Sequence, residues 1–253
     1  MPEIPEIQVI VDGIEKEVVG SQVEDIIVFD GRRVDDNIKQ VVGTSLESVR
    51  RHGKAIILQF GDTTVMFHLR LHGFVRIVDD ISFPEKGWIV AFHMGDKYLV
   101  LGDTRKLAEA KLVTEDELKT SPDASQIDEN TFKDIVSSSG TIKSTLMNQE
   151  KILGLGNRYV DEILWRAHIH PTKKGKDLTD DEIHKIFITM KEVLDEAYRQ
   201  GGDEHYTDVY GNPGRWSSSV HGKKVCPVCG TPLKKVKVGG RTSYICPKCQ
   251  PEP

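Results

Sequence analysis

The sequence predicts an α+β protein with an N-terminal β-sandwich that begins with a helix, then a helical domain, and finally a C-terminal zinc ribbon. Three observations lead to this fold class. Short apolar segments separated by turn residues recur up to residue 113, helical periodicity replaces them afterwards, and all four cysteines lie in the last 28 residues. We therefore place the domains at 1–113, 114–221 and 222–253.

The first domain is predicted to open with a helix. Its apolar residues recur at helical spacing from Ile7 to Val18, Pro5 suits the first helical turn, and Gly20 can end the helix. Short strands follow, and turn residues such as Gly61-Asp62 separate several of them, which is typical of a β-sandwich. The predicted strands are Val23–Phe29, Ser45–Arg50, Ala55–Phe60, Thr64–His68, Phe74–Val78, Trp88–His93 and Tyr98–Leu101.

The second domain is predicted to be helical. Helical periodicity marks four segments, and a loop over 201–221 leads from the last of them to the ribbon. The predicted helices are Glu129–Ser137, Ile142–Asn148, Asn157–Ala167 and Asp180–Tyr198. No run approaches the roughly 18 apolar residues that a membrane-spanning helix needs, so we expect no membrane partner.

The four cysteines form two Cys-x-x-Cys pairs, Cys226 with Cys229 and Cys246 with Cys249, separated by 16 residues. Four thiolates at this spacing can converge on one tetrahedral Zn²⁺, which supplies folding free energy to a segment too short for its own core. Disulfides or redox dithiols are the alternative. Because no apolar signal segment follows Met1 and no other cysteine is present, a structural zinc and a cytoplasmic location are the preferred interpretation.

The charge is unevenly spread. The net charge of −5 argues mildly against a nucleic-acid partner, yet residues 222–250 hold seven basic residues and no acid, whereas 115–134 hold seven acids. A basic ribbon on an otherwise acidic protein can form a local phosphate-binding surface. A lysine-rich hairpin that is merely exposed to solvent would have the same charge pattern.

The opening Met1-Pro2-Glu3 carries potential chemistry. Removal of the initiator methionine would expose Pro2 as a secondary α-amine, which is partly neutral and nucleophilic near pH 8. Such an amine can attack an aldehyde-like carbon and form an iminium, with Glu3 as the adjacent general acid and base. Proline and glutamate at this position are also common at an ordinary helix start.

Two further segments suit phosphate binding. The segments 142–149 and 154–157 predict a helix-turn-helix whose turn and second N-terminus point backbone amides outward, with Lys143 as an added cation. Asn157 can act there as an N-cap. In the ribbon, Gly239 and Gly240 predict a tight hairpin turn that presents Arg241.

Together these motifs resemble the formamidopyrimidine-DNA glycosylase/endonuclease VIII family, in the right order over nearly the whole chain. No single motif decides the resemblance, but their collinear order does. The matching segments are Met1–Glu6, Arg51–Lys54, His68–Gly73, Gly102–Arg105, Gly154–Tyr159 with Asp161-Glu162, Ile169–Pro171, and the Cys₄ ribbon with Gly240–Thr242.

The resemblance implies a bifunctional DNA glycosylase and apurinic/apyrimidinic lyase of base-excision repair, with a helix-two-turn-helix domain. Pro2 would attack C1′ of a damaged nucleotide flipped out of the duplex, and Glu3 would donate and shuttle the proton. Lys54 would contact the phosphate or sugar beside the lesion, and β- then δ-elimination would cut the strand.

The remaining site residues also follow from the resemblance. Asn157 and Arg241 would clamp the flanking phosphates, with Arg241 grouped with the catalytic residues, and Lys143 would add a DNA contact. Arg105 and Leu71 would enter the gap left by the flipped nucleotide. The implied partner is double-stranded DNA with a damaged base or abasic site, bound by a monomeric, nucleoid-associated bacterial protein with one structural Zn²⁺.

Some positions depart from the family pattern. Leu71 stands where a methionine wedge is typical, Leu107 replaces the usual phenylalanine, and 201–225 is shorter than in the branch that removes 8-oxoguanine. The lesion is therefore left open between 8-oxoguanine, an oxidised pyrimidine and a ring-opened purine. If Met1 is retained, the Pro2 nitrogen is an amide and the chemistry fails. A catalytically silent DNA-binding relative is the alternative, which the intact Pro2, Glu3 and Lys54 argue against. An unrelated zinc-ribbon scaffold is a third possibility, which the collinear motifs argue against.

Overall fold

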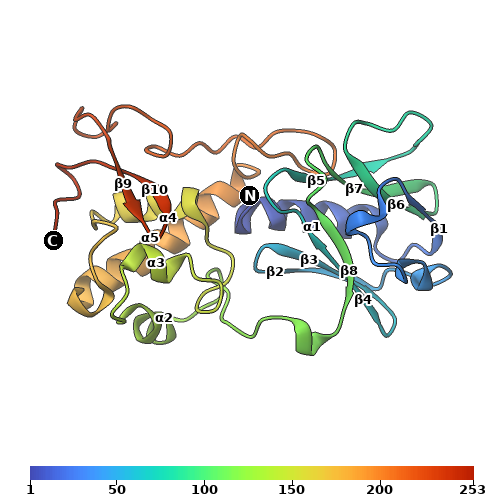
Figure 1. Cartoon of the computed structure of the whole chain (residues 1–253), viewed down its shortest axis with the longest axis horizontal. Helices are drawn as coiled ribbons and strands as arrows, with labels where there is room; N and C mark the ends of the chain where they lie inside the picture. The colour runs from blue at the N-terminus through green and yellow to red at the C-terminus, as the bar shows by residue number, and fades with distance from the viewer. The chain divides into compact units, whose positions relative to one another are not determined.

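The computed structural model describes all residues, 1–253, as two compact units. Unit 1 comprises Met1–Lys119 with Gln200–Arg215, and unit 2 comprises Thr120–Arg199 with Trp216–Pro253. The chain thus leaves unit 1, returns for one short segment and leaves again (Figure 1). No helix is long and apolar enough to cross a bilayer. The proposed boundaries at 113 and 221 stay a prediction.

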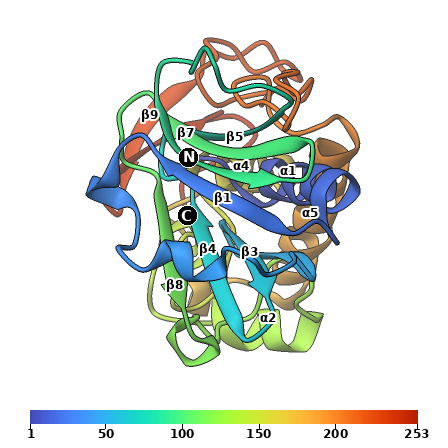
Figure 2. The same cartoon turned by 90° about the vertical axis from the view of Figure 1, so that its right-hand side faces the viewer.

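Unit 1 is a sandwich of two four-stranded antiparallel sheets (Figure 2). Helix α1 (Ile4–Val18) precedes them, and three short 3₁₀ helices lie at Gly31–Arg33, Ile38–Val41 and Glu115–Glu117. The first sheet has the order β1 (Val23–Val28), β6 (Trp88–Met94), β7 (Lys97–Asp103), β5 (Gly73–Val78). The second has the order β2 (Ser48–His52), β3 (Ala55–Phe60), β4 (Thr63–His68), β8 (Glu109–Val113).

These elements confirm the predicted β-sandwich and its opening helix. The seven predicted strands are present with shifts of a few residues at their ends, and β8 is an additional strand that the sequence did not single out. Strand β8 pairs with β4. Because it contains Glu109 and Lys111, its sequence lacks the run of apolar residues by which the other strands were recognised.

The core of unit 1 lies between the sheets and the apolar face of α1. Ile7, Ile10 and Ile14 of that helix are buried together with the aromatic rings of the strands. Burial of each such side chain contributes about 1.5–3 kcal/mol. Val209 of the returning segment belongs to the same cluster, and a Cβ added to Gly13 would lie 2.5 Å from its Cγ2. Glycine at position 13 thus lets the segment 200–215 pack directly on α1.

Unit 2 combines four helices with one hairpin. The helices are α2 (Glu129–Val136), α3 (Ile142–Leu146), α4 (Asn157–Arg166) and α5 (Asp180–Arg199), with a 3₁₀ turn at Gly175–Asp177, and the hairpin pairs β9 (Lys234–Val238) with β10 (Arg241–Ile245). Helix α5 packs on α2 and α4, and α4 also contacts β10. The four predicted helices are confirmed.

One detail of the prediction is wrong. Gly156, in extended conformation, is the N-cap of α4, so Asn157 is its first helical residue. A glycine is an acceptable N-cap, which leaves the Asn157 side chain available for another contact.

Candidate active site and nucleic-acid interface

The first residues of the chain are anchored before α1 begins. Pro2 is buried and Glu3 is 4 % exposed. The Glu3 backbone N–H donates to Glu6 Oε2 at 2.8 Å, so the buried Glu6 carboxylate fixes the entry into the helix. Pro2 is therefore held at a fixed point, with Met1 attached to its nitrogen.

The same Glu6 carboxylate also fastens the returning segment of unit 1. Its Oε1 accepts the backbone N–H of Asp203 at 2.9 Å, a contact between residues 197 positions apart. The close approach requires Gly202, since a Cβ there would lie 3.0 Å from Glu6 Cγ, and its φ is +86°. Tyr206, on this segment, accepts a hydrogen bond from the Met1 amino group at 2.6 Å. Residues 202–206 therefore border the N-terminus.

Lys54 and His68 lie together at the end of paired strands. Ala55, directly after Lys54, is the cross-strand partner of His68. The His68 Nδ1 accepts the Arg70 backbone N–H at 3.1 Å, so the neutral ring carries its proton on Nε2. Burial, followed by the charges of Arg70 and Lys54, lowers the pKa of His68 to about 4. At neutral pH this position therefore presents a neutral N–H donor beside the Lys54 cation.

The loop after β4 holds Leu71 at its exposed tip. Leu71 is 45 % exposed, and the loop is closed by a hydrogen bond from Gly73 N–H to the Leu69 carbonyl at 2.8 Å. Arg70 adopts the left-handed conformation, φ +54°, which is costly for a residue with a Cβ. Its guanidinium donates to the buried Glu109 carboxylate at 2.7 Å and so holds the loop in this shape.

Glu109 gathers several cations around this loop. Besides Arg70 it binds Arg33 at 3.2 Å and Lys111 at 3.3 Å. Burial alone would raise the pKa of Glu109, but the hydrogen bond and charge of Arg70, with Lys111, leave it below its ordinary value. The carboxylate is therefore charged and fixes the positions of three exposed cationic side chains.

Arg105 lies on a second loop, which starts next to the first. Asp103 pairs with Gly73 across β7 and β5, so both loops leave the sheet at the same edge. The buried Asp103 carboxylate accepts the backbone N–H groups of Arg105 at 2.7 Å, Leu107 at 3.1 Å and Ala108 at 3.0 Å. Arg105 and Leu107 are exposed above it. The structure thus brings Leu71, Arg105 and Leu107 to one edge of unit 1.

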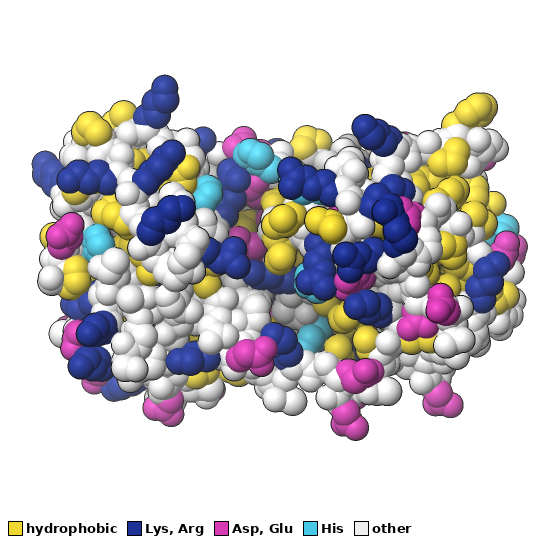
Figure 3. All heavy atoms as spheres, in the orientation of Figure 1, with side chains coloured by type: hydrophobic (Ala, Val, Ile, Leu, Met, Phe, Trp, Pro, Cys, Tyr) yellow, Lys and Arg dark blue, Asp and Glu magenta, His cyan; other side chains and the backbone are white.

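In unit 2, Asn157 and the hairpin carrying Arg241 are in direct contact. The Asn157 Nδ2 donates to the Thr242 carbonyl at 3.0 Å, next to the exposed Arg241. The turn consists of Gly239 and Gly240, with φ of +54° and +75°, as a two-residue type I′ turn requires. Lys and Arg side chains gather over the hairpin region at the upper left of Figure 3. The arrangement suits phosphate binding from two elements at once.

The predicted DNA contact of Lys143 does not fit the structure. Its side chain is 1 % exposed, and its Nζ donates to Asp161 Oδ1 at 2.6 Å. The other carboxylate oxygen of Asp161 contacts His221 Nδ1 at 2.7 Å and accepts the Tyr244 N–H at 3.3 Å. Lys143 therefore serves an internal ion pair that joins α3 and α4 to the ribbon, because burial leaves it no access to a phosphate.

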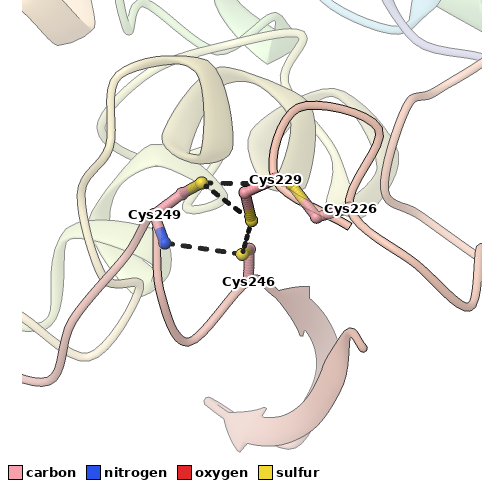
Figure 4. Close-up of side chains that lie close together, drawn as sticks. All are labelled: Cys226, Cys229, Cys246 and Cys249. Atoms are coloured by element: carbon pink, nitrogen blue, oxygen red, sulfur yellow. Dashed lines mark hydrogen bonds between the residues drawn. The ribbon is translucent and has the colours of Figure 1, made fainter. Parts of the chain in front are cut away.

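The four cysteines converge in unit 2 as predicted (Figure 4). Their Sγ atoms lie within 4.8 Å of one another, with separations of 3.4 Å, 3.6 Å and 3.9 Å for three of the pairs. A tetrahedral ion with Zn–S bonds of 2.3 Å places its sulfurs about 3.8 Å apart, whereas a disulfide needs about 2.05 Å. The donor set fits one structural Zn²⁺, with all four positions taken by protein ligands.

Family comparisons agree with this layout. The chain matches the formamidopyrimidine-DNA glycosylase N-terminal domain over residues 1–110, the formamidopyrimidine-DNA glycosylase H2TH domain over 118–208, and the zinc finger found in FPG and IleRS over 223–251. The fold and the site therefore define a DNA N-glycosylase of base-excision repair with a zinc finger.

Individual relatives match over the whole chain. The formamidopyrimidine-DNA glycosylases of Listeria innocua and Streptococcus pneumoniae are 30 % and 32 % identical to it, each over 99 % of this chain and 100 % and 99 % of their own length. The solved complex of Lactococcus lactis Fpg with DNA containing an abasic site aligns with a TM-score of 0.91 at 31 % identity, over 99 % of this chain and 100 % of that one. The chain belongs to the formamidopyrimidine-DNA glycosylase family.

The structure adds residues that the sequence did not single out for the site. Tyr206 and Glu109 make contacts between distant positions, and no local pattern marks them. Glu6 lies in the matched opening segment, but its contact with Asp203, 197 positions away, could not be read from the sequence. His68 stood in a recognised motif, and its cross-strand position next to Lys54 now gives it a place in the site.

Proposed function

We propose that this chain is a bifunctional DNA glycosylase and AP lyase that removes an oxidised or ring-opened base and cuts the strand by β,δ-elimination. The observation that carries the proposal is the buried Pro2-Glu3 pair at the start of α1, anchored through Glu6. The names of the matched relatives supply the substrate class, a formamidopyrimidine lesion in DNA.

The chemistry starts once Met1 has been removed. The secondary amine of Pro2 attacks C1′ of the flipped nucleotide, the C1′–base bond breaks, and the base leaves with a proton from Glu3. Glu3 then takes the proton from the Pro2 nitrogen and passes it to O4′ as the C1′–O4′ bond breaks, which opens the sugar and leaves an iminium between Pro2 and C1′. That cation withdraws electrons, so a C2′ proton is lost and the 3′ phosphate leaves. A second elimination releases the 5′ phosphate, and water then frees Pro2.

Other residues position the DNA. Lys54 supplies a cation and His68 a neutral N–H donor at one strand end in unit 1, which suits the charged backbone beside the lesion. In unit 2, Asn157 and Arg241 provide contacts to phosphates. Leu71 and Arg105, at one edge of unit 1, would fill the space left by the flipped nucleotide.

The two loops also bear on the lesion. Leu71 and Leu107 are aliphatic and exposed, so they can fill a gap in the base stack but offer no polar group for reading the opposite base. One solved complex of the Lactococcus lactis enzyme holds DNA with an oxidised pyrimidine and aligns with a TM-score of 0.90. We therefore keep oxidised pyrimidines beside ring-opened purines as substrates. We also propose that the protein acts as a monomer and associates with the bacterial nucleoid.

A catalytically silent DNA-binding relative is the second candidate. In a protein that retains Met1 the Pro2 nitrogen is an amide and cannot attack C1′, which would leave DNA binding without turnover. The two candidates differ at the N-terminus of the mature protein, which intact mass measurement determines.

Borohydride trapping on abasic and lesion-bearing duplexes tests the proposal. Processed protein should form a covalent adduct whose linkage maps to residue 2, and Glu3→Gln should lower base removal by about 100-fold or more. The mechanism would be refuted if processed protein formed no adduct. It would also be refuted if the DNA were linked to another residue and Pro2→Gly left that adduct unchanged.

A further inference from the structure

The hydroxyl of Tyr206 lies close to the nitrogen that the proposed chemistry uses. It is 2.6 Å from the Met1 amino nitrogen. That atom is joined to the Pro2 nitrogen through two carbons, and the three bonds sum to about 4 Å. The Tyr206 oxygen is therefore within about 7 Å of the Pro2 nitrogen.

Met1 shows where a nucleotide bonded to Pro2 would lie, an inference that rests on the proposed function. The Pro2 nitrogen is planar in the present amide, and it is equally planar in an iminium. The pyrrolidine ring fixes two of its three substituents, so the third direction is common to both species. C1′ of the substrate would thus take the place of the Met1 carbonyl carbon. The sugar atoms beyond C1′ would extend towards the space of Met1 Cα and N, beside the Tyr206 hydroxyl.

Tyr206 is held in place from several sides within unit 1. Its N–H donates to the Asp203 carbonyl at 3.0 Å, and its own carbonyl accepts the Gly214 N–H at 3.0 Å. Gly214 cannot carry a side chain, because a Cβ would lie 2.1 Å from the Gly202 carbonyl oxygen. The Asp203 N–H is bound by Glu6, which also binds the Glu3 N–H. One carboxylate therefore fixes both Tyr206 and the start of the chain.

We propose that Tyr206 is a further substrate-contacting residue, whose hydroxyl donates a hydrogen bond to O4′ of the nucleotide bonded to Pro2. A tyrosine hydroxyl can both donate and accept a hydrogen bond. O4′ is attached to C1′ and gains negative charge as the sugar opens. A fixed donor at this atom stabilises the opening without transferring its own proton.

Single-turnover kinetics of processed Tyr206→Phe test the contact. Because the sugar is present in both substrates, the variant should slow adduct formation on an abasic duplex and base removal from a lesion duplex alike. Loss of one neutral hydrogen bond corresponds to about 3- to 10-fold. The melting temperature and the affinity for an uncleavable duplex should stay as in the wild type.

Tyr210→Phe is the matched control. Tyr210 is on the same segment, but its hydroxyl donates to Glu17 Oε1 at 2.6 Å, so its rates should equal those of the wild type. Equal rates for Tyr206→Phe and the wild type would overturn the assignment, as would a defect limited to the substrate that still carries its base. A wild type that forms no adduct at all refutes the Pro2 chemistry instead, so the two failures are distinguishable.

Discussion

The two units support their functional residues in opposite ways. In unit 1, Pro2 and Glu3 stand at the start of a helix whose apolar face lies in a large sandwich core. In unit 2, Arg241 stands on a hairpin beside a small buried cluster of Trp165, Val220 and two cysteines that belong to the zinc site. The first site is therefore held by apolar burial and the second by a metal, so each should respond to a different perturbation.

A shared device nevertheless appears in both units. One buried carboxylate in each fastens segments far apart in the sequence: Glu6 holds the Glu3 and Asp203 N–H groups, and Asp161 holds Lys143, His221 and the Tyr244 N–H. Both carboxylates accept backbone amides, and in unit 2 the partners also include the buried Lys143 ammonium. Loss of the Asp161 carboxylate is therefore costly, because it removes the counterion of a buried charge.

Removal of zinc should have the largest effect, and it should destabilise unit 2 while leaving unit 1 folded. A structural zinc contributes about 10 kcal/mol or more to the folding of such a module. Chelation should therefore unfold the hairpin and abolish binding of duplex DNA, while amide hydrogens of α1 keep their protection from exchange. Fluorescence anisotropy with labelled duplex, together with hydrogen exchange, measures both effects.

Two comparisons complete this experiment. Adding Zn²⁺ back should restore binding, and Cys246→Ser should reproduce the loss without a chelator. Metal-free protein that binds DNA as tightly as the loaded form would contradict the division of roles.

Asp161→Asn should be the next most severe change. It leaves the Lys143 ammonium, 1 % exposed, without its carboxylate, which costs about 3–5 kcal/mol. We expect lower stability of unit 2 and weaker DNA binding at unchanged zinc content, measured by urea unfolding and metal analysis.

The matched control is Asp195→Asn, since Asp195 pairs with Arg199 on the exposed surface of α5 and such a pair is worth under about 1 kcal/mol. Adding Lys143→Met to Asp161→Asn should restore part of the stability, because no buried charge remains. A double variant as unstable as Asp161→Asn would show that the ion pair is not the cause.

These contacts also mark how far the sequence could go. Periodicity predicted α1, the strands and the helices, and the Cys-x-x-Cys spacing predicted the metal site, because those signals are local. Lys143 was predicted to contact DNA, and nothing in the residues around it indicates that it is buried. Its burial depends on Asp161 and on the ribbon, and Asn157 likewise meets Thr242 across 85 positions. Such pairings are decided by tertiary packing and leave no local pattern.

Lowering the pH should reduce the free energy of unfolding of the protein, because His68 in unit 1 is buried in its neutral form. Burial, with the charges of Arg70 and Lys54, lowers the pKa of His68 to about 4 in the folded protein, against about 6.5 in the unfolded chain. Between these values the unfolded state binds more protons, so stability falls as the pH falls through this window. The full shift corresponds to about 3 kcal/mol at most.

His68→Asn tests this contribution, because asparagine offers an oxygen to the Arg70 N–H but does not titrate. The difference in unfolding free energy between the variant and the wild type should shift in favour of the variant as the pH falls from 7 to 4. A difference that stays constant over this range would refute the buried neutral histidine.

Arg241→Ala should give the smallest effect, and it sharpens the role of the hairpin. The side chain is exposed on β10 beside the Asn157–Thr242 contact, so its removal should leave stability and zinc content unchanged. If Arg241 neutralises one phosphate, the slope of log K against log salt should become shallower by about 1, and affinity should fall alike on damaged and undamaged duplexes. Arg199→Ala, on α5, is the control and should keep the wild-type slope. An unchanged slope for Arg241→Ala would mean that the zinc-held hairpin does not bind phosphate through this residue, and the basic lysines around it would then have to carry the contact.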